Sequence, residues 1–522
     1  MSRKAKHPIQ SLKGFRDILP DDQKYWDFIY DKTRQIALDY GFKKLDTPMV
    51  EDARLYMKAT GQFTDIIEKE LYVFEDKGGE KVALRPEFTP GVLRSYLEHG
   101  MINQPQPVKL FSYGPVFRHD KPQAGRYRQF NQFNFETIGS AEPETDARLI
   151  AMVKALYYSF GLDVMIEINS IGCHDCREKY VKKLVKFLKD QEKKLCENCK
   201  ERLHKNPLRV LDCKEKHCQT ITEGAPQIID NLCEECKNHF VKVLEHLDAA
   251  EVVYSLNPRL VRGLDYYSRT TFEIYLSEEA GKLAPEEARA ALGGGGRYDG
   301  LMEILGGRKT PALGMAGGVE RVINVLRRLK IEVPDPDQAD VFIAQLGEEA
   351  KKKCQKLFDE MRKQNIRVRE AFAKNSLKGQ LEVADKLKVK FALILGQKEI
   401  MDGTIIIRDM NSGIQEIVVF DNIIDEIKKR LLGASDVKIY TDRSAVGPST
   451  APAMSLPAEH KKHHYKKRQK EESGGGDNFS EDKDFELPAN KDDDDDFLGG
   501  DEVVSLEDVK EDEGLTDGEE QW

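Results

Sequence analysis

Residues 117–139 bring several cationic side chains close together in a segment that reads FRHDKPQAGRYRQFNQFNFETIG. Arg118, Lys121, Arg126 and Arg128 are followed by aromatic residues that alternate with polar ones. A guanidinium group forms two parallel charge-assisted hydrogen bonds with a phosphate or carboxylate, and it does not deprotonate in a protein. The segment therefore favours a ligand with negative charge and a flat apolar part, although in isolation it is equally compatible with an exposed hairpin.

Four other segments favour a binding site over an exposed hairpin. RPEFT at 85–89 places the carboxyl group of Glu87 between a proline and a hydroxyl group, and LVRGLDYYSR at 260–269 contains Arg262 and two tyrosines. GGGGRYDGL at 293–301 and GMAGGVERV at 314–322 are rich in glycine, and Arg321 stands at the start of the helix predicted after the second of them. The first is predicted to be a turn that lets a substrate approach the backbone closely, because glycine lacks a Cβ atom.

Eight of the nine cysteines lie in one span of the chain and form four closely spaced pairs, namely Cys173 and Cys176, Cys196 and Cys199, Cys213 and Cys218, and Cys233 and Cys236. These spacings are compatible with tetrahedral zinc, and two four-cysteine sites would use all eight thiols. Reduced thiols within a helical insertion are the alternative. The ninth cysteine, Cys354, is predicted to be a core residue on an amphipathic helix.

The elements that position these residues follow from the hydrophobic periodicity. A helix is predicted from residue 20 to residue 40, because apolar residues recur at helical spacing between Pro20 and Gly41. KVALRP, KLFSYGPVFRH, QFNQFNFETIG and RTTFEIYL are strand-like, and together they predict a mixed, mostly antiparallel sheet. Side chains alternate between the faces of a strand, so Phe133 and Phe135 are expected in the core, opposite Gln132 and Glu136.

A chain of 522 residues is too long for one hydrophobic core and is expected to divide into domains. We predict a catalytic domain at 1–172 and 251–333 that is interrupted by a mainly helical, cysteine-rich insertion at 173–250. A linker at 334–338 leads to a small α/β domain at 339–432. Residues 433–522 lack apolar periodicity and are predicted to be a disordered, low-complexity tail.

The net charge of −10 is concentrated in the tail, where 11 Lys and Arg stand against 25 Asp and Glu. The first 432 residues therefore carry a balance of +4, and basic patches on them could meet a polyanion. The mean hydropathy is −0.57 and no apolar run reaches the roughly 18 residues needed to span a bilayer, so membrane insertion is not expected. With no secretory signal recognisable before residue 20, the cytoplasm is the expected location.

Four separated segments of the chain resemble motifs of the histidyl-tRNA synthetases, a family of class II aminoacyl-tRNA synthetases, and they occur in the order expected for that family. FRHDKPQAGRYRQFNQF is similar to the second class II motif, GMAGGVERV to the third, and DTPMVED to the first, while LVRGLDYY resembles a segment peculiar to the histidine enzymes. The resemblance covers residues 10–432 and departs from the family pattern at Asn131 and Phe88. It implies an α+β fold with a class II catalytic domain, a helical insertion and a C-terminal α/β anticodon-binding domain.

The activity that this resemblance implies is ATP-dependent formation of histidyl-adenylate, followed by transfer of histidine to the 3′ end of tRNA(His). L-Histidine, ATP with Mg²⁺, and tRNA(His) are then the expected ligands, with a homodimer as the expected assembly and no DNA or membrane as partner. A regulatory paralogue of histidine biosynthesis that does not charge tRNA is the alternative, and a tRNA-binding scaffold is a third possibility.

The resemblance also implies roles for individual residues. Arg118 and Arg262 would hold the α-phosphate of ATP and the carboxylate of histidine, and would act by positioning and electrostatic stabilisation. Asp120 and Arg126 would contact the adenine edge and the outer phosphates, while Phe130 and Arg321 would stack on the two faces of the base.

The histidine substrate would be read by hydrogen bonds to its imidazole and to its amino group. Glu136 and Tyr267 would face the two ring nitrogens, and Tyr266 would line the pocket. The amino group would be met by Glu87, Thr89 and Gln132, with the backbone of Phe88 completing that wall. Gln123 and Arg128 would contact the acceptor end of the tRNA.

Overall fold

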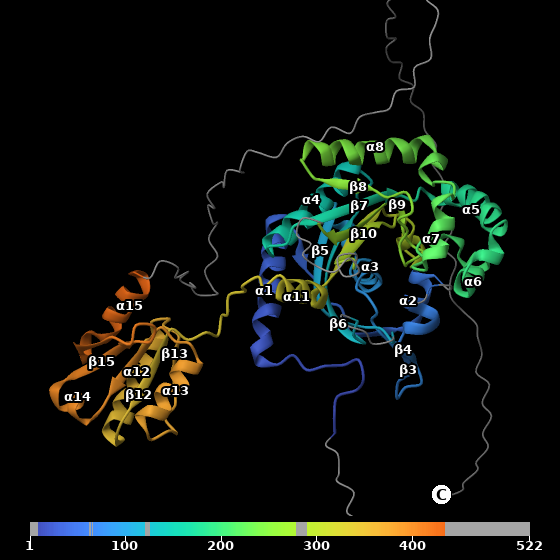
Figure 1. Cartoon of the computed structure of the whole chain (residues 1–522). Helices are drawn as coiled ribbons and strands as arrows, with labels where there is room; N and C mark the ends of the chain where they lie inside the picture. Colours follow the sequence, from blue (N-terminus) through green and yellow to red (C-terminus); the bar gives the residue numbers. More distant parts are fainter. Residues whose placement is uncertain (1–8, 62–63, 65, 121–125, 278–289, 434–522) are drawn as a thin grey trace, which may run out of the picture. The chain divides into compact units, whose positions relative to one another are not determined.

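The computed structural model describes residues 9–61, 64, 66–120, 126–277 and 290–433 (Figure 1). Gln123, expected to contact tRNA, and residues 434–522 of the predicted tail lie outside the described residues. No helix in the described part of the chain combines the length and the apolar character that crossing a bilayer requires.

The residues of the candidate site are positioned by a large sheet of eight strands within the described residues, in the order β1-β5-β6-β11-β10-β9-β7-β8. Only the outermost pairs, β1 with β5 and β7 with β8, are parallel, so the predicted mostly antiparallel sheet is confirmed. The strands are β1 (Lys43–Lys44), β5 (Val108–Phe117), β6 (Gln129–Ile138), β11 (Ala312–Gly318), β10 (Gly293–Arg297), β9 (Ser268–Leu276), β7 (Val164–Ser170) and β8 (Tyr254–Leu256).

One face of this sheet packs against a layer of helices, namely α1 (Pro20–Asp39), α4 (Pro143–Ser159), α8 (Glu234–Ala249) and α11 (Val319–Arg328) (Figure 1). Both α1 and α4 begin with proline, which is suited to the first turn because the amide it lacks has no intrahelical partner there. Phe133 and Phe135 are fully buried in the core beneath these helices, as predicted, among residues such as Leu156 and Tyr157.

The opposite face of the large sheet carries the segments that contain the candidate site residues, together with a smaller sheet. The small sheet has the order β2-β4-β3, with β2 (Val50–Asp52), β4 (Lys81–Leu84) and β3 (Val73–Glu75), and it is flanked by α2 (Ala53–Thr60), α3 (Thr89–Glu98), α10 (Leu301–Ile304) and the short π-helix η1 (Ile66–Glu70). A second core on this face includes Phe88, Tyr266, Tyr267 and Tyr298.

The cysteine-rich span consists of α5 (His174–Lys189), α6 (Glu197–Lys205), α7 (Lys216–Glu223) and α8, joined by the 3₁₀ turns η3 (Glu192–Lys194), η4 (Pro207–Val210) and η5 (Ile229–Asn231). Each of α5, α6 and α8 begins directly after a cysteine, at Cys173, Cys196 and Cys233 respectively. The cysteines therefore lie at helix starts, where the chain changes direction.

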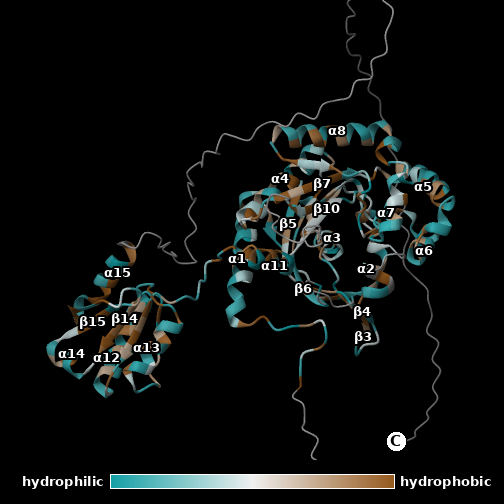
Figure 2. Cartoon of the chain, in the orientation of Figure 1, coloured by the Kyte–Doolittle hydropathy of each residue, from teal (hydrophilic) through white to brown (hydrophobic). Residues whose placement is uncertain are grey.

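The C-terminal α/β domain has a five-stranded sheet in the order β13-β12-β14-β15-β16. Its elements are β12 (Val341–Gln345), α12 (Glu348–Lys363), β13 (Val368–Glu370), α13 (Leu377–Lys386), β14 (Phe391–Leu395), α14 (Gln397–Asp402), β15 (Thr404–Asp409), β16 (Gln415–Val419) and α15 (Ile423–Gly433). Apolar residues concentrate on β12 and β14, while the helices present polar residues (Figure 2). Cys354 is fully buried in this core, as predicted.

The glycine-rich segment at 293–297 was predicted to be a turn, and this prediction is wrong. It forms the central strand β10, which pairs antiparallel with β9 and β11. The glycines are required because there is no room for side chains: a Cβ atom at Gly295 would lie 2.2 Å from the carbonyl oxygen of Gly314. The sequence suggested a turn because glycine is normally depleted in strands.

Candidate active site

Arg118 and its neighbours form a cationic region where β5 and β6 join. The backbone amide of Arg118 donates to the carbonyl of Arg128 at 2.9 Å, and its Nε donates to the carbonyl of Pro86 at 3.0 Å. The Arg118 guanidinium lies 5.6 Å from the centre of the Phe130 ring. Arg126 forms an ion pair with Asp120 at 2.9 Å, so the four predicted nucleotide contacts from this segment are brought together.

Arg321 supplies a third guanidinium group to this region from the start of α11. Its Nη1 donates to the carbonyl of Ala291 at 2.5 Å. Burial lowers the pKa of Arg321, and the positive charges of Arg126 and Arg118 lower it further. Because arginine keeps its proton at neutral pH, the three like charges repel one another until an anion binds between them. This arrangement suits a phosphate group.

Arg262 approaches the sheet from the loop between β8 and β9. It forms an ion pair with Glu273 on β9, and its guanidinium lies 5.6 Å from the centre of the Tyr267 ring. Burial alone would lower the pKa of Arg262, but the negative charge of Glu273 holds it above the ordinary value. Gly294 on β10 makes room for this side chain, since a Cβ atom there would lie 2.5 Å from Arg262 Nη1.

Glu136 is the most enclosed carboxyl group of the site, and its side chain is fully buried on β6. Thr89 Oγ1 donates to Glu136 Oε1 at 2.5 Å, and the Tyr298 hydroxyl donates to Glu136 Oε2. Burial raises the pKa of Glu136 to about 8, against the effect of the Thr89 hydrogen bond. Gly314 on β11 provides the space for this carboxyl group, because a Cβ atom there would lie 1.7 Å from Glu136 Oε2.

Two further buried acceptors lie on this face without a partner among the described residues. Glu87 Oε2 accepts from the Tyr266 hydroxyl at 2.9 Å, whereas Glu87 Oε1 and Gln132 Oε1 have no hydrogen-bond partner there. Burial raises the pKa of Glu87, and the positive charge of Arg118 opposes that rise. Since unpaired buried acceptors are costly, they indicate a ligand that donates hydrogen bonds, such as an ammonium group.

Three tyrosine rings pack against one another beside these carboxyl groups. The rings of Tyr266 and Tyr267 are centred 4.8 Å apart, and Tyr298 lies 5.5 Å from Tyr266 and 6.3 Å from Tyr267. Phe88 is buried below them, with the guanidinium of Arg85 4.3 Å from its ring centre. The structure thus groups all the predicted histidine-binding residues on the face of the sheet opposite α4.

Asn131, which departs from the family pattern, and Arg128, which was predicted to contact the acceptor end of the tRNA, both join neighbouring segments of the chain. Asn131 donates from its backbone amide to Glu320 at 3.0 and 2.9 Å, and from Nδ2 at 3.1 Å. It therefore ties β6 to the start of α11, which carries Arg321. Arg128 bonds through its backbone amide to the carbonyl of Gly14 at 2.8 Å, and through Nε to the carbonyl of Asp120 at 3.4 Å.

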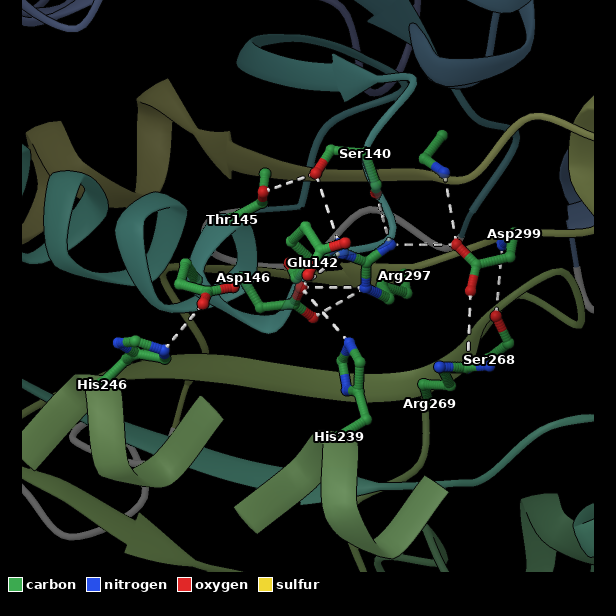
Figure 3. A network of polar contacts seen from close by, with 12 residues as sticks. Ser140, Glu142, Thr145, Asp146, His239, His246, Ser268, Arg269, Arg297 and Asp299 are labelled. Atoms are coloured by element: carbon green, nitrogen blue, oxygen red, sulfur yellow. Dashed lines mark hydrogen bonds and ion pairs between the residues drawn. The ribbon is translucent and has the colours of Figure 1, made fainter. Parts of the chain in front are cut away.

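Tyr298 and Glu273 belong to the site but were not predicted from the sequence. The available signal was the alternation Gly294, Gly296, Tyr298, which places Tyr298 on the same face as the glycines once the segment is recognised as a strand. The intervening Arg297 points to the opposite face, where it pairs with Asp146 and Asp299 in a buried network (Figure 3).

The eight cysteines are brought together as two sets of four. The first set is Cys173, Cys176, Cys233 and Cys236, the second is Cys196, Cys199, Cys213 and Cys218, and within each set the sulfur atoms lie within 4.8 Å of one another. Four sulfurs around zinc would be about 3.8 Å apart at a tetrahedral Zn–S distance of about 2.3 Å. Backbone amides donate to Cys236, Cys176 and Cys218 sulfurs at 3.3, 3.0 and 3.3 Å, as is suited to thiolate ligands.

Comparisons with known proteins find that this chain is similar to histidyl-tRNA synthetases over most of its length. A family model described as histidyl-tRNA synthetase matches residues 14–322, and one described as anticodon binding domain matches residues 340–430. A histidine–tRNA ligase of Dehalococcoides mccartyi is 45% identical over 423 residues, which cover 81% of this chain and 100% of the relative. Another, of Pelotomaculum thermopropionicum, is 41% identical over 422 residues, with 81% and 98% covered. The crystal structure of apo histidyl-tRNA synthetase from S. aureus superposes with a TM-score of 0.68 at 35% identity, covering 81% of this chain and 100% of that one.

Proposed function

Because the chain belongs to the histidyl-tRNA synthetase family, we infer that it is a histidine–tRNA ligase of class II, which activates L-histidine with ATP and transfers it to the 3′ end of tRNA(His). The observation that carries this inference furthest is the placement of the buried side chains of Glu136, Glu87 and Gln132 on one face of the sheet, with Arg118 and Arg262 close enough to act on Glu87. Such an arrangement suits a ligand that has hydrogen-bond donors at one end and is joined to phosphate at the other.

In the first step a histidine carboxylate oxygen attacks the α-phosphorus of ATP, and the bond to the β-phosphate breaks to release pyrophosphate. Arg118 and Arg262 would hold the α-phosphate and the carboxylate, and would stabilise the negative charge that develops on phosphorus. Glu273 would orient Arg262 through their ion pair. Mg²⁺ bound with ATP would neutralise phosphate charge, as is usual for triphosphate substrates.

The nucleotide base would lie against Phe130, with Arg321 on its other face. Asp120 and Arg126, already paired with each other, would contact the base edge and the outer phosphates. In the second step the terminal ribose hydroxyl of the tRNA attacks the activated carbonyl carbon, and AMP leaves. Gln123 and Arg128 would contact the acceptor end, and the C-terminal domain would bind the anticodon, as its family model indicates.

The imidazole of histidine would be held between Glu136 and Tyr267, with Tyr266 lining the pocket. Because the pKa of Glu136 is raised to about 8, its carboxyl group is mostly protonated at neutral pH, and its carbonyl oxygen can accept a hydrogen bond from a ring N–H. The carboxyl group becomes ionised as the pH rises further. Glu87 and Gln132 would accept from the α-amino group, together with Thr89 and the backbone of Phe88. A site built on paired hydrogen bonds strongly rejects amino acids that lack them.

The two four-cysteine sets would each hold a structural zinc ion. Their ligand type, number and sulfur separation fit tetrahedral zinc, and the amide donors would support thiolate charge. Bound zinc would fix helix starts in the insertion and would take no part in the reaction.

The assembly would be a homodimer in the cytoplasm. Exposed apolar side chains on and beside the small sheet, including Met49, Val50, Val73 and Phe74, offer a surface that a second copy would cover. Sedimentation equilibrium tests this part of the proposal, with a mass of two chains expected.

A regulatory paralogue that does not charge tRNA is the weaker alternative, because Arg118, Arg262, Arg321 and Glu136 are all present and the anticodon-binding domain is matched as well. Charging of a tRNA(His) transcript with labelled histidine separates the two functions. Histidine bound to the RNA is expected, and the absence of both histidine activation and charging would favour the paralogue.

A further inference from the structure

The loop that carries Arg262, Tyr266 and Tyr267 is held by side chains of the cysteine-rich insertion. Arg177 Nη1, on α5, donates to the carbonyl oxygens of Asp265 at 3.1 Å and of Tyr267 at 2.9 Å. These bonds fix the backbone on either side of Tyr266. They come from outside the catalytic sheet, so the conformation of the loop depends on the position of the insertion.

A second contact comes from the turn that follows α6. Asn206 Nδ2 donates to Asp265 Oδ1 at 2.7 Å, and Arg209 lies against the backbone of the same loop, since a Cβ atom at Gly263 would be 2.9 Å from Arg209 Nη1. On its other side Asp265 packs against Gly61, where a Cβ atom would be 2.6 Å from Asp265 Oδ2. Asp265 is therefore enclosed between the end of α2 and the insertion.

A third contact lies at the end of the loop, where β9 begins. Arg269 forms an ion pair with Glu235 on α8. Its Nε also lies 3.7 Å from Oδ2 of Asp299, which belongs to the network that surrounds Arg297 (Figure 3). The amide of Arg269 donates to the carbonyl of Gly172 at 2.8 Å. Both ends of the histidine-binding loop are thus attached to segments that adjoin cysteines.

Each contact comes from a residue close in sequence to one of the cysteine sets. Arg177 follows Cys176 directly, and Glu235 lies between Cys233 and Cys236, all in the first set. Asn206 ends the helix that begins after Cys196, and Cys213 and Cys218 of the second set follow it. Each group of contacts to the loop therefore comes from a segment that adjoins one of the two cysteine sets.

We propose that the cysteine-rich insertion sets the position of the histidine-binding loop, with Arg177 and Asn206 as positioning residues whose placement depends on metal in the two four-cysteine sets. The proposal rests on the zinc sites and the histidine-binding roles inferred above. Neither positioning residue touches substrate. Both act through the loop backbone and Asp265. Their loss should affect histidine, which would meet Arg262, Tyr266 and Tyr267 of the loop, more than ATP, which would meet the loop at Arg262 alone and is held elsewhere by Arg118, Arg126 and Arg321.

The first test is the variant Asn206→Ala in the full-length, zinc-loaded protein, assayed by histidine-dependent pyrophosphate exchange. Losing one hydrogen bond of about 1 kcal/mol corresponds to an increase of about fivefold in KM for histidine, with KM for ATP within about twofold of wild type and zinc content unchanged. The matched control is Asn231→Ala, because Asn231 lies in the insertion and donates to Gln227 without contacting the loop. An unchanged KM for histidine, or equal increases for histidine and ATP, would overturn the proposal.

The second test measures the loop itself by amide hydrogen exchange. Cys199→Ser should lose one zinc and increase exchange in a peptide covering 260–267, whereas Asn231→Ala should not. If zinc is lost and exchange in that peptide stays at the wild-type level, the metal does not act on the loop. Absence of zinc from the wild-type protein would instead refute the metal sites, and the Asn206→Ala kinetics would still decide the positioning role.

Discussion

The hydroxyl group of Tyr298 donates a hydrogen bond to the buried carboxyl group of Glu136, across the gap that Gly314 leaves in β11. Glu136 is thereby held by two hydroxyl donors, Tyr298 and Thr89, from different segments of the chain. The residue expected to recognise imidazole is fixed before histidine binds, so little reorganisation is needed on binding.

Replacing Tyr298 with Phe should lower kcat/KM for histidine in the activation reaction by about 10- to 100-fold, since hydrogen bonds to charged or buried carboxyl groups contribute about 1.5–3 kcal/mol. The ring remains, so packing against Tyr266 and Tyr267 should be preserved. Tyr254→Phe is the matched control, because the Tyr254 hydroxyl bonds to Asp248 in an exposed position. Equal kinetics in the two variants would contradict the role given to Tyr298.

The raised pKa of Glu136 predicts a pH-dependent stability of the ligand-free protein. With a folded-state pKa of about 8 against an ordinary value of 4.5, the folded protein binds the proton that the unfolded chain has lost between these values. The contribution of Glu136 is then favourable below about pH 4.5, and is lost progressively as pH rises towards 8. Glu136→Gln has nearly the same side-chain shape but does not titrate. The melting temperature of the variant minus that of the wild type should therefore increase by several degrees between pH 5 and pH 8, because only the wild type loses stability over this range. A constant difference across that range would show that the carboxyl group does not titrate there.

Gly294→Ala should displace the side chain of Arg262 without replacing that residue. The new Cβ atom would lie 2.5 Å from Arg262 Nη1 and 2.8 Å from the backbone carbonyl oxygen of Phe272, so both the guanidinium and the neighbouring β9 backbone must move. Activation should fall by at least about 100-fold, the scale for removing one preorganised donor and the effect expected of Arg262→Ala, while tRNA affinity stays near wild type. Gly300→Ala is the control, because a Cβ atom there meets nothing within 4 Å. Normal activation in Gly294→Ala would rule out the position assigned to Arg262.

Elemental analysis of protein purified without added metal should find two zinc ions per chain. Cys176→Ser and Cys199→Ser, each from a different set, should each retain one, and Cys354→Ser should retain both because Cys354 belongs to the core of the other domain. Finding no zinc, or finding disulfides in place of it, would refute the metal sites.

The large sheet and the two faces of its strands could be predicted because they depend on local patterns, whereas the roles of the site residues were implied by the resemblance to the family. Alternation along β6 placed Phe133 in the core and Gln132 with Glu136 on the opposite face, and the structure agrees. β10 could not be predicted, because its glycines are required by the neighbours Arg262 and Gly314, which are distant in sequence. Tyr298 was missed for the same reason.

The cysteine sets, too, could be predicted only in part from the sequence. Each pair can be recognised from its spacing, but which pairs combine depends on how α5, α6 and α8 meet in space. Likewise, Glu273 has no motif around it, and only the pairing of β9 with β10 brings its carboxylate to Arg262. Long-range contacts of this kind leave no local signal in one sequence.

The central claim, that this site activates histidine with ATP, is tested most directly by ATP–pyrophosphate exchange measured separately with each of the twenty amino acids. Exchange should occur with histidine alone, and Tyr298→Phe should weaken it. Exchange with another amino acid, or none with histidine, would contradict the account.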